Sequence, residues 1–537
     1  MNSATNSLSQ GRRNWLRLLA MICLMTCCTL ASSCKQTNKQ KSSQPNVLFI
    51  VLDTTRADRL GLYGHHRPTT PFLDEWAKKA LVFEDCLSAS STTVPSHASM
   101  FTGLLPSTHL TDNSHPTLDD KYETLAEILG KSGYRSFLFS ANPFVAADNN
   151  FDQGFDVTEH PWSDQHITKS ADIIRAKIDP TDKSSDLPRK FQSGQVADWA
   201  IKACGEVAEG ALTSWLDRSE SDKPYFAFIN YMEAHRPLLP PRRIREKFMT
   251  KAQIARSYKT DVSWARMWEY VFDLFDYRRE EEEVIDLTYD AAIAELDEIL
   301  KSLLTTVEQR GELDNTLVII TADHGEHLCE HHLLDHQYSL YQPLLKVPMI
   351  LWHPSRVTAG RNSDPVANID VFPTILELAD IASKPTPSQH ARSLMQTTAQ
   401  RVRHSDYFSP PTRQINEAKR IHRSWNPKPF LRKLRAVVDG NYKLIWSSDQ
   451  DHALYDLSTD PGEKHNLFNR EPEIATAILA QIIPAAKRGA DGSHASKEPH
   501  SAGHAQRMTA LGYAGSDDSD VNTTGVDTNG TEWQTEK

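Results

Sequence analysis

Three short, almost entirely apolar runs most constrain how this chain of 537 residues can fold. They span residues 46–52, 225–230 and 316–321, and each is rich in branched or aromatic side chains. Such runs are typical of strands that are buried on both faces of a sheet. We therefore expect an α/β fold with a mainly parallel sheet that is flanked by helices.

Polar residues follow each of these runs. Asp53 comes directly after the first, the segment 233–235 (Glu-Ala-His) follows the second, and Asp323 and His324 follow the third. The carboxyl ends of neighbouring parallel strands meet at one edge of a sheet, where ligands bind in open α/β folds. Carboxylates and imidazoles together have the composition of a metal site. The sequence therefore predicts one shared site at this edge.

The sequence between and after the runs predicts further elements. Helical periodicity indicates helices over 118–132 and 289–310. The charged and aromatic segment 242–283 is interpreted as a solvated helical insertion near the mouth of the site, with a substrate-contacting lid as the alternative. Apolar runs around Asp-Gly-Asn in 436–446 predict a β-hairpin, and a later helix should run to about Ile483.

The N-terminus has the features of a bacterial export signal. Residues 12–17 contain three arginines, resemble a twin-arginine signal and precede an apolar stretch over 18–31 that is too short to span a bilayer comfortably. Residues 30–34 resemble a lipobox that ends in the cysteine to be lipidated. We expect an exported, periplasmic or cell-envelope protein anchored by lipid at Cys34, with cleavage near Ser33 to a free exported protein as the alternative.

The predicted organisation has five parts. They are a signal and lipobox segment (1–34), a solvated linker (35–45), a catalytic domain (46–385), a smaller C-terminal α+β domain (386–515) and a disordered tail (516–537). The tail is rich in Asp, Thr, Asn and Gly, and this composition does not support a packed core.

The charge balance excludes some classes of partner. Lys and Arg number 59 against 70 Asp and Glu, which gives a net charge of −11. No long basic run occurs, so bulk electrostatics argue against nucleic acid as a partner. Contact with a membrane is expected only through the lipid anchor, and an anionic ligand would have to be held by a local site.

Four motifs occur in a fixed order along the chain: 53–61 (DTTRADRLG), 93–103 (TVPSHASMFTG), 321–327 (TADHGEH) with His336, and 454–463 (LYDLSTDPGE). Together they resemble the sulfatase family of the alkaline phosphatase superfamily. The resemblance covers roughly residues 45–515 in the order of the family. It implies an alkaline-phosphatase-like fold and a metal-dependent hydrolase of sulfuric or phosphoric esters, whose substrate can be a glycan.

The resemblance also implies roles for individual residues. The implied ligands of one divalent metal ion (calcium, manganese or zinc) are Asp53, Thr93, Asp323 and His324. The implied catalytic residues are Thr93, His235, His336, His97 and Arg56. In this set Thr93 is the nucleophile, the imidazoles at 235 and 336 contact the anionic ester or protonate the leaving oxygen, and the side chains at 97 and 56 face the anion.

This chain departs from the family pattern at the nucleophile. Family sulfatases have Cys or Ser, which is converted to formylglycine, at the position of Thr93. Oxidation of Thr would give a ketone, because its β-carbon carries a methyl group, so no formylglycine is expected. Family members usually have Arg at the position of His97, and calcium-type sulfatases have a further Asp at the position of Thr54.

The remaining ligand set resembles the manganese or zinc site of phosphoglycerol and phosphoethanolamine transferases, in which a metal-bound Thr alkoxide is the nucleophile. Those transferases have several membrane-spanning helices ahead of the catalytic domain, whereas this chain has one short signal. The sequence therefore predicts an ester hydrolase with Thr93 as the metal-bound nucleophile. Phosphotransfer by the same residues and a catalytically silent glycan-binding lipoprotein stay open as alternatives, and sulfate and phosphate esters are not separated.

Overall fold

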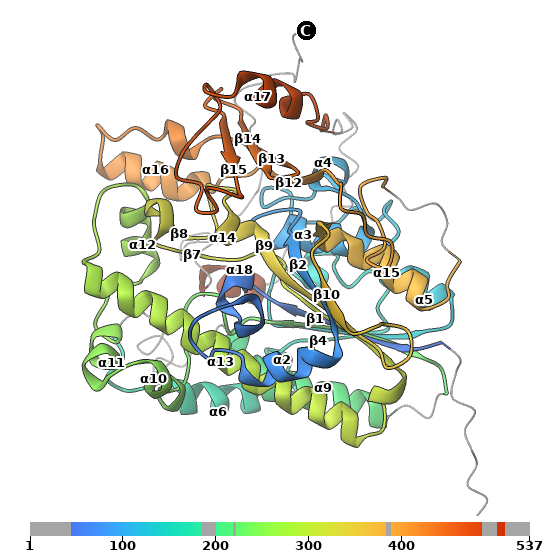
Figure 1. Ribbon diagram of the computed structural model, residues 1–537. Coiled ribbons are helices and arrows are strands. Elements are labelled where there is room, and N and C mark those ends of the chain that lie inside the picture. The colour runs from blue at the N-terminus through green and yellow to red at the C-terminus, as the bar shows by residue number, and fades with distance from the viewer. Residues whose placement is uncertain (1–43, 184–199, 219–221, 383–387, 486–501, 511–537) are drawn as a thin grey trace, which may run out of the picture. The chain divides into compact units, whose positions relative to one another are not determined.

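The three apolar runs form adjacent strands at the centre of the protein (Figure 1). The computed structural model describes residues 44–183, 200–218, 222–382, 388–485 and 502–510. The runs form β1 (Asn46–Leu52), β5 (Tyr225–Tyr231) and β6 (Thr316–Thr321). β1 pairs in parallel with both β5 and β6, so the carboxyl ends of all three strands lie at the same edge of the sheet.

The central sheet of the described chain has nine strands, in the order β10-β2-β9-β6-β1-β5-β3-β4, with β11 paired to β2. The strands not yet given are β2 (Leu81–Leu87), β3 (Arg135–Ser140), β4 (Val157–Glu159), β9 (Lys346–Trp352), β10 (Gly360–Asn362) and β11 (Val366–Ala367). β9 runs antiparallel to β2 and β6, and the other pairs are parallel. The predicted mainly parallel sheet is confirmed.

Helices cover both faces of this sheet (Figure 1). Alternate residues of β1 belong to different hydrophobic cores, Leu48 to one and Phe49 to the other. The first core includes α2 (Pro71–Trp76), α9 (Cys204–Asp217) and α13 (Arg279–Gln309), and the second includes α3 (Thr93–Thr102), α5 (Leu125–Lys131) and α15 (Val371–Leu378). Burial on both faces explains why the run 46–52 does not alternate between polar and apolar residues.

The helix predicted over 118–132 is shorter than expected. Only α5 forms, because Thr124 and Glu127 make a capping box that fixes the start of the helix at Leu125. The side chain of each residue bonds to the backbone N–H of the other. The residues before Thr124 therefore form a loop.

The segment 242–283 is helical, as predicted. It forms α10 (Arg242–Phe248), α11 (Lys251–Ser257) and α12 (Trp264–Val271) and includes the first turn of α13. The helix predicted over 289–310 begins at Arg279, where acidic residues of the first turn suit the positive end of the helix dipole. The remaining α-helices of the described residues are α4 (Pro106–His109), α6 (Ile167–Lys177), α14 (Gln342–Leu345), α16 (Thr412–Ile421), α17 (Pro472–Leu479) and α18 (Ala502–Ala510).

The C-terminal region forms a smaller antiparallel sheet, seen with α17 at the top of Figure 1. Its strands are β12 (Arg403–Tyr407), β13 (Leu434–Asp439), β14 (Tyr442–Ser447) and β15 (Ala453–Asp456). β13 and β14 form the predicted hairpin, and Gly440 in its turn has a φ of 55°, which glycine adopts readily. The helix expected to reach Ile483 is α17, which ends at Leu479.

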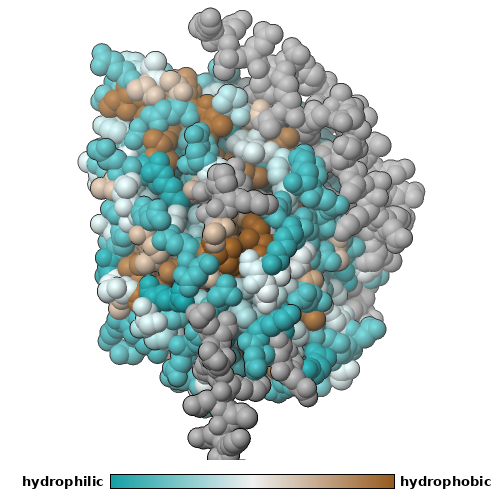
Figure 2. All heavy atoms as spheres, turned by 90° about the vertical axis from the view of Figure 1, so that its right-hand side faces the viewer, coloured by the Kyte–Doolittle hydropathy of each residue, from teal (hydrophilic) through white to brown (hydrophobic). Residues whose placement is uncertain are grey.

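From Gln44 onward the described chain forms one compact unit. The predicted signal (1–34), most of the linker (35–43) and the predicted tail (516–537) lie outside the described residues, as does the predicted boundary at Pro385. Among the residues that the structure describes, no helix has the length and apolarity needed to cross a bilayer. Polar side chains cover most of the face shown in Figure 2, and hydrophobic ones gather there in small patches.

A buried ion pair connects the small sheet to the larger one. Lys443 on β14 and Glu463 are fully buried, and Lys443 Nζ lies 2.7 Å from Glu463 Oε1. The other carboxylate oxygen, Oε2, accepts a hydrogen bond from the backbone N–H of Gln342 at 2.6 Å. Gln342 begins α14, which leads directly into β9.

We predict that Glu463→Gln lowers the free energy of unfolding by about 3–5 kcal/mol, because the buried Lys443 ammonium loses its charge partner. Urea titration followed by circular dichroism measures the change. The matched control is Glu84→Gln, which removes the carboxylate of a half-exposed pair with Arg361 and should cost less than about 1 kcal/mol. Equal losses in the two variants would contradict the prediction.

Candidate active site

The polar clusters predicted from the sequence meet at the carboxyl edge of the central sheet. Asp53 follows β1, and Asp323 and His324 follow β6. All three side chains are fully buried, and each offers a ligand atom within 4.8 Å of the others. Thr54 connects the two strand ends: its φ of 58° is unusual for a β-branched residue, and its backbone N–H donates to Asp323 Oδ1 at 3.1 Å.

One oxygen of each carboxylate is held by the protein and the other has no donor. Asp53 Oδ2 accepts hydrogen bonds from Asn142 at 2.8 Å and Asn230 at 3.2 Å. Asp323 Oδ1 accepts from two backbone N–H groups. The second oxygens, Asp53 Oδ1 and Asp323 Oδ2, are buried and accept no hydrogen bond from the described residues. Buried carboxylate oxygens without donors fit a divalent cation, so these residues suit the metal that the sequence predicts.

His324 brings a nitrogen that could bind a metal ion next to Thr93. His324 Nδ1–H donates to the carbonyl of Gly325 at 2.9 Å, which leaves Nε2 as that nitrogen. Nε2 lies 3.3 Å from Thr93 Oγ1 and 3.3 Å from Asp323 Oδ2. Burial and the neighbouring His336 lower the pKa of His324 to about 3, so the imidazole is neutral, which is the form that binds metals.

Thr93 is placed by the start of helix α3. It is the first residue of this ten-residue helix and is 2% exposed. The positive end of the helix dipole favours negative charge that develops on the hydroxyl oxygen. Ser96, in the same turn, donates from Oγ to the carbonyl of Asp323 at 2.7 Å, which joins the helix to the segment that carries Asp323 and His324.

His97 contacts the protein on both ring nitrogens. Nδ1–H donates to the carbonyl of Thr93 at 3.0 Å, and Nε2 accepts from Asn230 Nδ2 at 3.1 Å. The rings of Phe101, Phe151 and Phe228 lie against it edge to face. Burial lowers the pKa of His97, so it is neutral. This differs from the expectation that His97 faces the anion, because its polar atoms hold Thr93 and Asn230 instead.

Arg56 also has protein partners. Its guanidinium lies 2.7 Å from the Asp58 carboxylate and 2.6 Å from that of Glu330, and it donates to the carbonyl of Glu326 at 3.1 Å. Burial raises the pKa of Glu330, but Arg56 outweighs it and brings the pKa down to about 2. The contacts place Arg56 in support of the segment after His324, which differs from the expectation that it faces the anion.

His235 and His336 lie together beside the metal-ligand group. The ring centroids of His235 and His336 are 5.2 Å apart, and those of His336 and His324 are 4.5 Å apart. His235 Nδ1–H donates to the carbonyl of Arg236 at 2.6 Å, and burial lowers its pKa far enough to keep it neutral. The structure therefore brings His235 and His336 to the same place as Asp53, Asp323, His324 and Thr93.

Three residues of the site were not predicted from the sequence. Two of them donate hydrogen bonds to Asp53: Asn142, which follows β3, and Asn230, the only amide in β5. Their position as polar residues at strand ends is the sequence signal that could have identified them. Lys202 is fully buried and donates from Nζ to the carbonyls of Met232 and His235. Burial lowers the pKa of Lys202 to about 8. It fixes the loop that carries His235, and no pattern in the sequence marks it.

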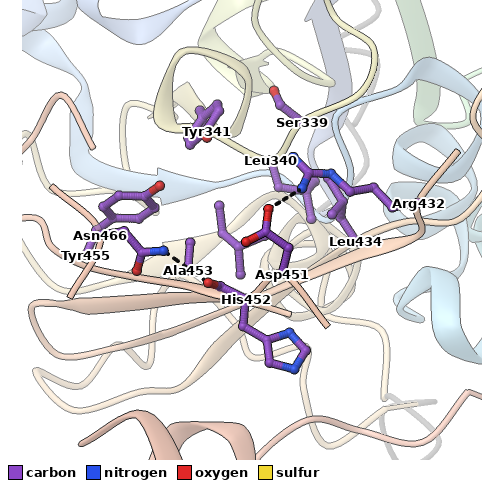
Figure 3. Close-up of a pocket in the computed structure, with 11 residues that line it drawn as sticks. Ser339, Leu340, Tyr341, Arg432, Leu434, Asp451, His452, Ala453, Tyr455 and Asn466 are labelled. Carbon is purple, nitrogen blue, oxygen red and sulfur yellow. Dashed lines mark hydrogen bonds and ion pairs between the residues drawn. The ribbon is translucent and has the colours of Figure 1, made fainter. Parts of the chain in front are cut away.

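A separate cavity of about 100 Å³ lies between the segment 339–341 and the small C-terminal sheet (Figure 3). Arg432 and Asp451 face each other across it, 3.3 Å apart. Its lining also includes Ser339, Leu340, Tyr341, Leu434, Ile445, His452, Ala453, Tyr455 and Asn466. The residues of the histidine and carboxylate cluster do not line this cavity.

Comparison with known proteins identifies the family. The model of the family "Sulfatase" matches residues 45–381, and the model of "N-sulphoglucosamine sulphohydrolase, C-terminal" matches residues 329–484. The chain belongs to the sulfatase family. This confirms the resemblance seen in the sequence. As a member of this family, the protein is a sulfatase-like ester hydrolase.

Relatives of this sulfatase-family protein include the N-acetylglucosamine-6-O-sulfatase of Bacteroides thetaiotaomicron, which is 21% identical, with 82% of this chain and 85% of the relative covered. Arylsulfatase K of Bos taurus is 25% identical, with 84% of each chain covered. The solved phosphonate monoester hydrolase of Agrobacterium radiobacter has a TM-score of 0.63 at 19% identity, with 82% of this chain and 94% of that chain covered. Its likeness supports the predicted fold class.

We predict that Asn230→Ala lowers the affinity for a divalent cation by about 10- to 100-fold, because Asp53 Oδ2 loses a hydrogen bond that orients the carboxylate. Isothermal titration of the metal-free protein with manganese measures the affinity. Asn362→Ala is the matched control: it removes an amide on edge strand β10 that bonds to Thr397 at 2.9 Å, and it should leave the affinity unchanged. The same affinity in both variants would refute the role of Asn230.

We also predict that cation affinity falls below pH 7. Burial and the nearby Asp323 raise the pKa of Asp53 to about 7. Below that pH a cation must displace the proton of this carboxyl group, so affinity should drop by up to tenfold per pH unit, whereas above it the group is already ionised. Titrations at pH 5.5, 6.5, 7.5 and 8.5 give the profile. A flat profile between pH 5.5 and 7.5 would show that Asp53 is not a ligand.

Proposed function

We propose that this protein hydrolyses sulfate or phosphate esters with the hydroxyl of Thr93 as the nucleophile. The observation that carries the proposal is the position of Thr93 Oγ1, 3.3 Å from His324 Nε2, the nitrogen of the group that fits a metal ion. Two features favour ionisation of this hydroxyl at neutral pH. It lies beside a group that can hold a cation, and it lies at the positive end of a helix dipole.

The proposed metal ligands are Asp53, Asp323, His324 and Thr93. A bound divalent ion (calcium, manganese or zinc) would neutralise the carboxylates, lower the pKa of the hydroxyl and stabilise charge on the reacting ester. The protein supplies the orientation. His97 holds the backbone of Thr93 and Ser96 holds the helix against Asp323, so Oγ1 keeps one position relative to the strand ends.

The proposed reaction has two steps. In the first, Thr93 Oγ1 bonds to the sulfur or phosphorus as the ester bond breaks, and the hydroxyl proton passes through the neighbouring imidazoles of His235 and His336 to the leaving oxygen. In the second, water attacks the sulfur or phosphorus on Thr93, releases sulfate or phosphate, and restores the hydroxyl. The position of His235 and His336 beside His324 supports this role.

The names of the relatives support two ester chemistries. One relative is an N-acetylglucosamine-6-O-sulfatase, which supports a sulfated glycan as substrate, and a structural neighbour is a phosphonate monoester hydrolase. The side chain of Thr93 favours phosphorus. A phospho-Thr ester is resolved by attack at phosphorus, whereas a Thr sulfate ester would have to be hydrolysed at sulfur, which is harder.

We also propose that the protein is exported and held at the cell envelope by lipid on Cys34. The support is in the sequence: the arginines of 12–17, the apolar stretch 18–31 and the lipobox-like residues 30–34. These residues lie outside the described part of the chain. An envelope location would bring the active site to substrates outside the cytoplasm.

We predict that Thr93→Ala lowers kcat by about 10³-fold or more, while Thr93→Ser, which keeps a hydroxyl, retains measurable turnover. The assay uses chromogenic sulfate monoesters, phosphate monoesters and phosphate diesters, with the protein metal-free or supplied with calcium, manganese or zinc. Turnover of one ester class identifies the substrate chemistry. Activity of Thr93→Ala equal to that of the natural protein would eliminate Thr93 as the nucleophile.

A further inference from the structure

A small cavity lies between the helical insertion 242–283 and the body of α13. Figure 1 shows α10 and α11 of the insertion beside α13. The cavity has a volume of about 30 Å³, and the residues of the histidine and carboxylate cluster do not line it. Its polar lining consists of Arg236, Arg245 and the hydroxyls of Ser257, Thr260 and Thr288, and the rest of its wall is mainly apolar. This cavity is called the arginine cavity below.

Both arginines of this cavity are buried. Arg245 is 2% exposed and Arg236 is 4% exposed. Burial lowers the pKa of the Arg245 guanidinium, but an arginine side chain stays protonated in proteins. Two positive charges therefore line a cavity that is shielded from water. Buried charges are unfavourable unless an opposite charge accompanies them.

Arg245 has no carboxylate as a direct partner among the described residues. The charges of Asp182 and Glu295 act on it from beyond ion-pair distance. Glu295 is moreover paired with Lys177, at 2.6 Å, so its charge is already balanced. The positive charge of Arg245 is thus not cancelled by a contact with a carboxylate.

Arg236 likewise forms no ion pair within the part of the chain that the structure describes. Its charge acts on Glu326 from a distance. Glu326 directly precedes the two-stranded ribbon of β7 (His327–Leu328) and β8 (Leu334–Asp335), and its Oε1 lies 3.5 Å from His336 Nδ1, which follows this ribbon. The contact of Glu326 is therefore made outside the arginine cavity.

The guanidinium groups keep donors for a ligand. Arg245 donates from Nη1 to the hydroxyls of Ser257 and Thr288, each at 3.1 Å, while its Nη2 donates to none of the described residues. Each of these hydroxyls donates its own proton to a backbone carbonyl. Arg236 donates from Nη2 to the carbonyl of Val262 at 3.2 Å, and its Nε and Nη1 have no acceptor there. The hydroxyls thus orient Arg245, and the free N–H groups require an acceptor.

We propose that the arginine cavity binds one small inorganic anion of the size of chloride, held by Arg236 and Arg245. Such an anion accepts hydrogen bonds from several donors at once and supplies the missing negative charge. A volume of about 30 Å³ holds only one or two particles of the size of water, so a halide ion fits, whereas an ester substrate does not. The guanidinium group is weakly hydrated, so it gives up water to such an ion easily.

A bound anion would also support the loop that carries His235, and this consequence rests on the proposed function. The backbone carbonyl of Arg236 accepts the Nδ1–H of His235 at 2.6 Å. An anion that fixes the side chain of Arg236 therefore helps to hold His235 in one orientation. Arg236 is then a positioning residue and does not contact the ester.

Anomalous diffraction tests the site directly. Crystals of the full-length protein are grown from halide-free solution, soaked in sodium bromide and measured at the bromine absorption edge. We expect one peak in the arginine cavity, in contact with the guanidinium groups of both Arg236 and Arg245. A cavity without such a peak would overturn the proposal.

Thermal unfolding followed by circular dichroism tests binding in solution. The natural protein is heated at increasing concentrations of sodium chloride, with sodium gluconate added to keep the ionic strength constant. An anion that binds only the folded protein raises the midpoint, by about 3 °C at roughly 100 times its Kd for a chain of this size. Arg236→Gln removes one charge and a single hydrogen bond, and we expect it to abolish this rise.

Arg435→Gln is the matched control. Arg435 is also buried, but it is paired with Asp406 at 2.9 Å and lies on β13, outside the arginine cavity. This variant should unfold at a lower temperature than the natural protein and keep the rise with chloride. Loss of the rise in both variants would show a general effect of salt and would contradict the proposal.

Two further outcomes would overturn the proposal. Equal midpoints of the natural protein in chloride and gluconate, together with a bromide peak, would mean binding at crystal concentration only. A rise with sodium sulfate and none with chloride would make the ligand an oxyanion instead of a halide. If Arg236→Gln does not fold, the bromide peak and the chloride dependence of the natural protein decide together. Neither measurement uses turnover, so failure here leaves Thr93 as the proposed nucleophile.

Discussion

The burial of two carboxylates at neighbouring strand ends is the constraint on which the site depends. Asp53 and Asp323 have no access to water, so their negative charge needs hydrogen-bond donors and, in the proposed function, a cation. Amide groups from the ends of β3 and β5 meet part of it, and the left-handed backbone of Thr54 supplies another donor. The strands bring the two carboxylates together, and the residues at the strand ends supply the hydrogen bonds that stabilise them.

One amide group connects Asp53, the proposed metal ligand, to Thr93, the proposed nucleophile. Asn230 Nδ2 donates to Asp53 Oδ2 and also to His97 Nε2, so both of its N–H groups are used. His97 in turn donates to the carbonyl of Thr93. A change in the orientation of Asp53 would therefore alter the hydrogen bonds that position Thr93 at the start of α3. This explains why a fully buried, neutral imidazole surrounded by three phenylalanine rings lies so close to the chemistry.

The sequence revealed those parts of the structure that are encoded locally. β1, β5 and β6 followed from apolar runs, and the meeting of Asp53 with Asp323 followed from their place after parallel strands. The partners of His97 and Arg56 did not follow, because Asn230 and Glu330 are distant in sequence and only the fold brings them near. Lys202 carried no signal, since a lysine is expected at the surface. The helix predicted over 118–132 was too long, because the prediction followed the helical periodicity and missed the capping box at Thr124.

The contact between Glu463 and Gln342 has a consequence for how this protein can be divided. Gln342 begins α14, where the carbonyl of Leu344 accepts the backbone N–H of Gly325 at 2.7 Å, and the carbonyl of Gly325 orients His324. The small C-terminal sheet thus supports the loop that carries His324, a proposed metal ligand. The two sheets therefore have to be encoded together. A gene fragment that ended between them would encode all four proposed metal ligands but not the sheet that supports the loop of His324.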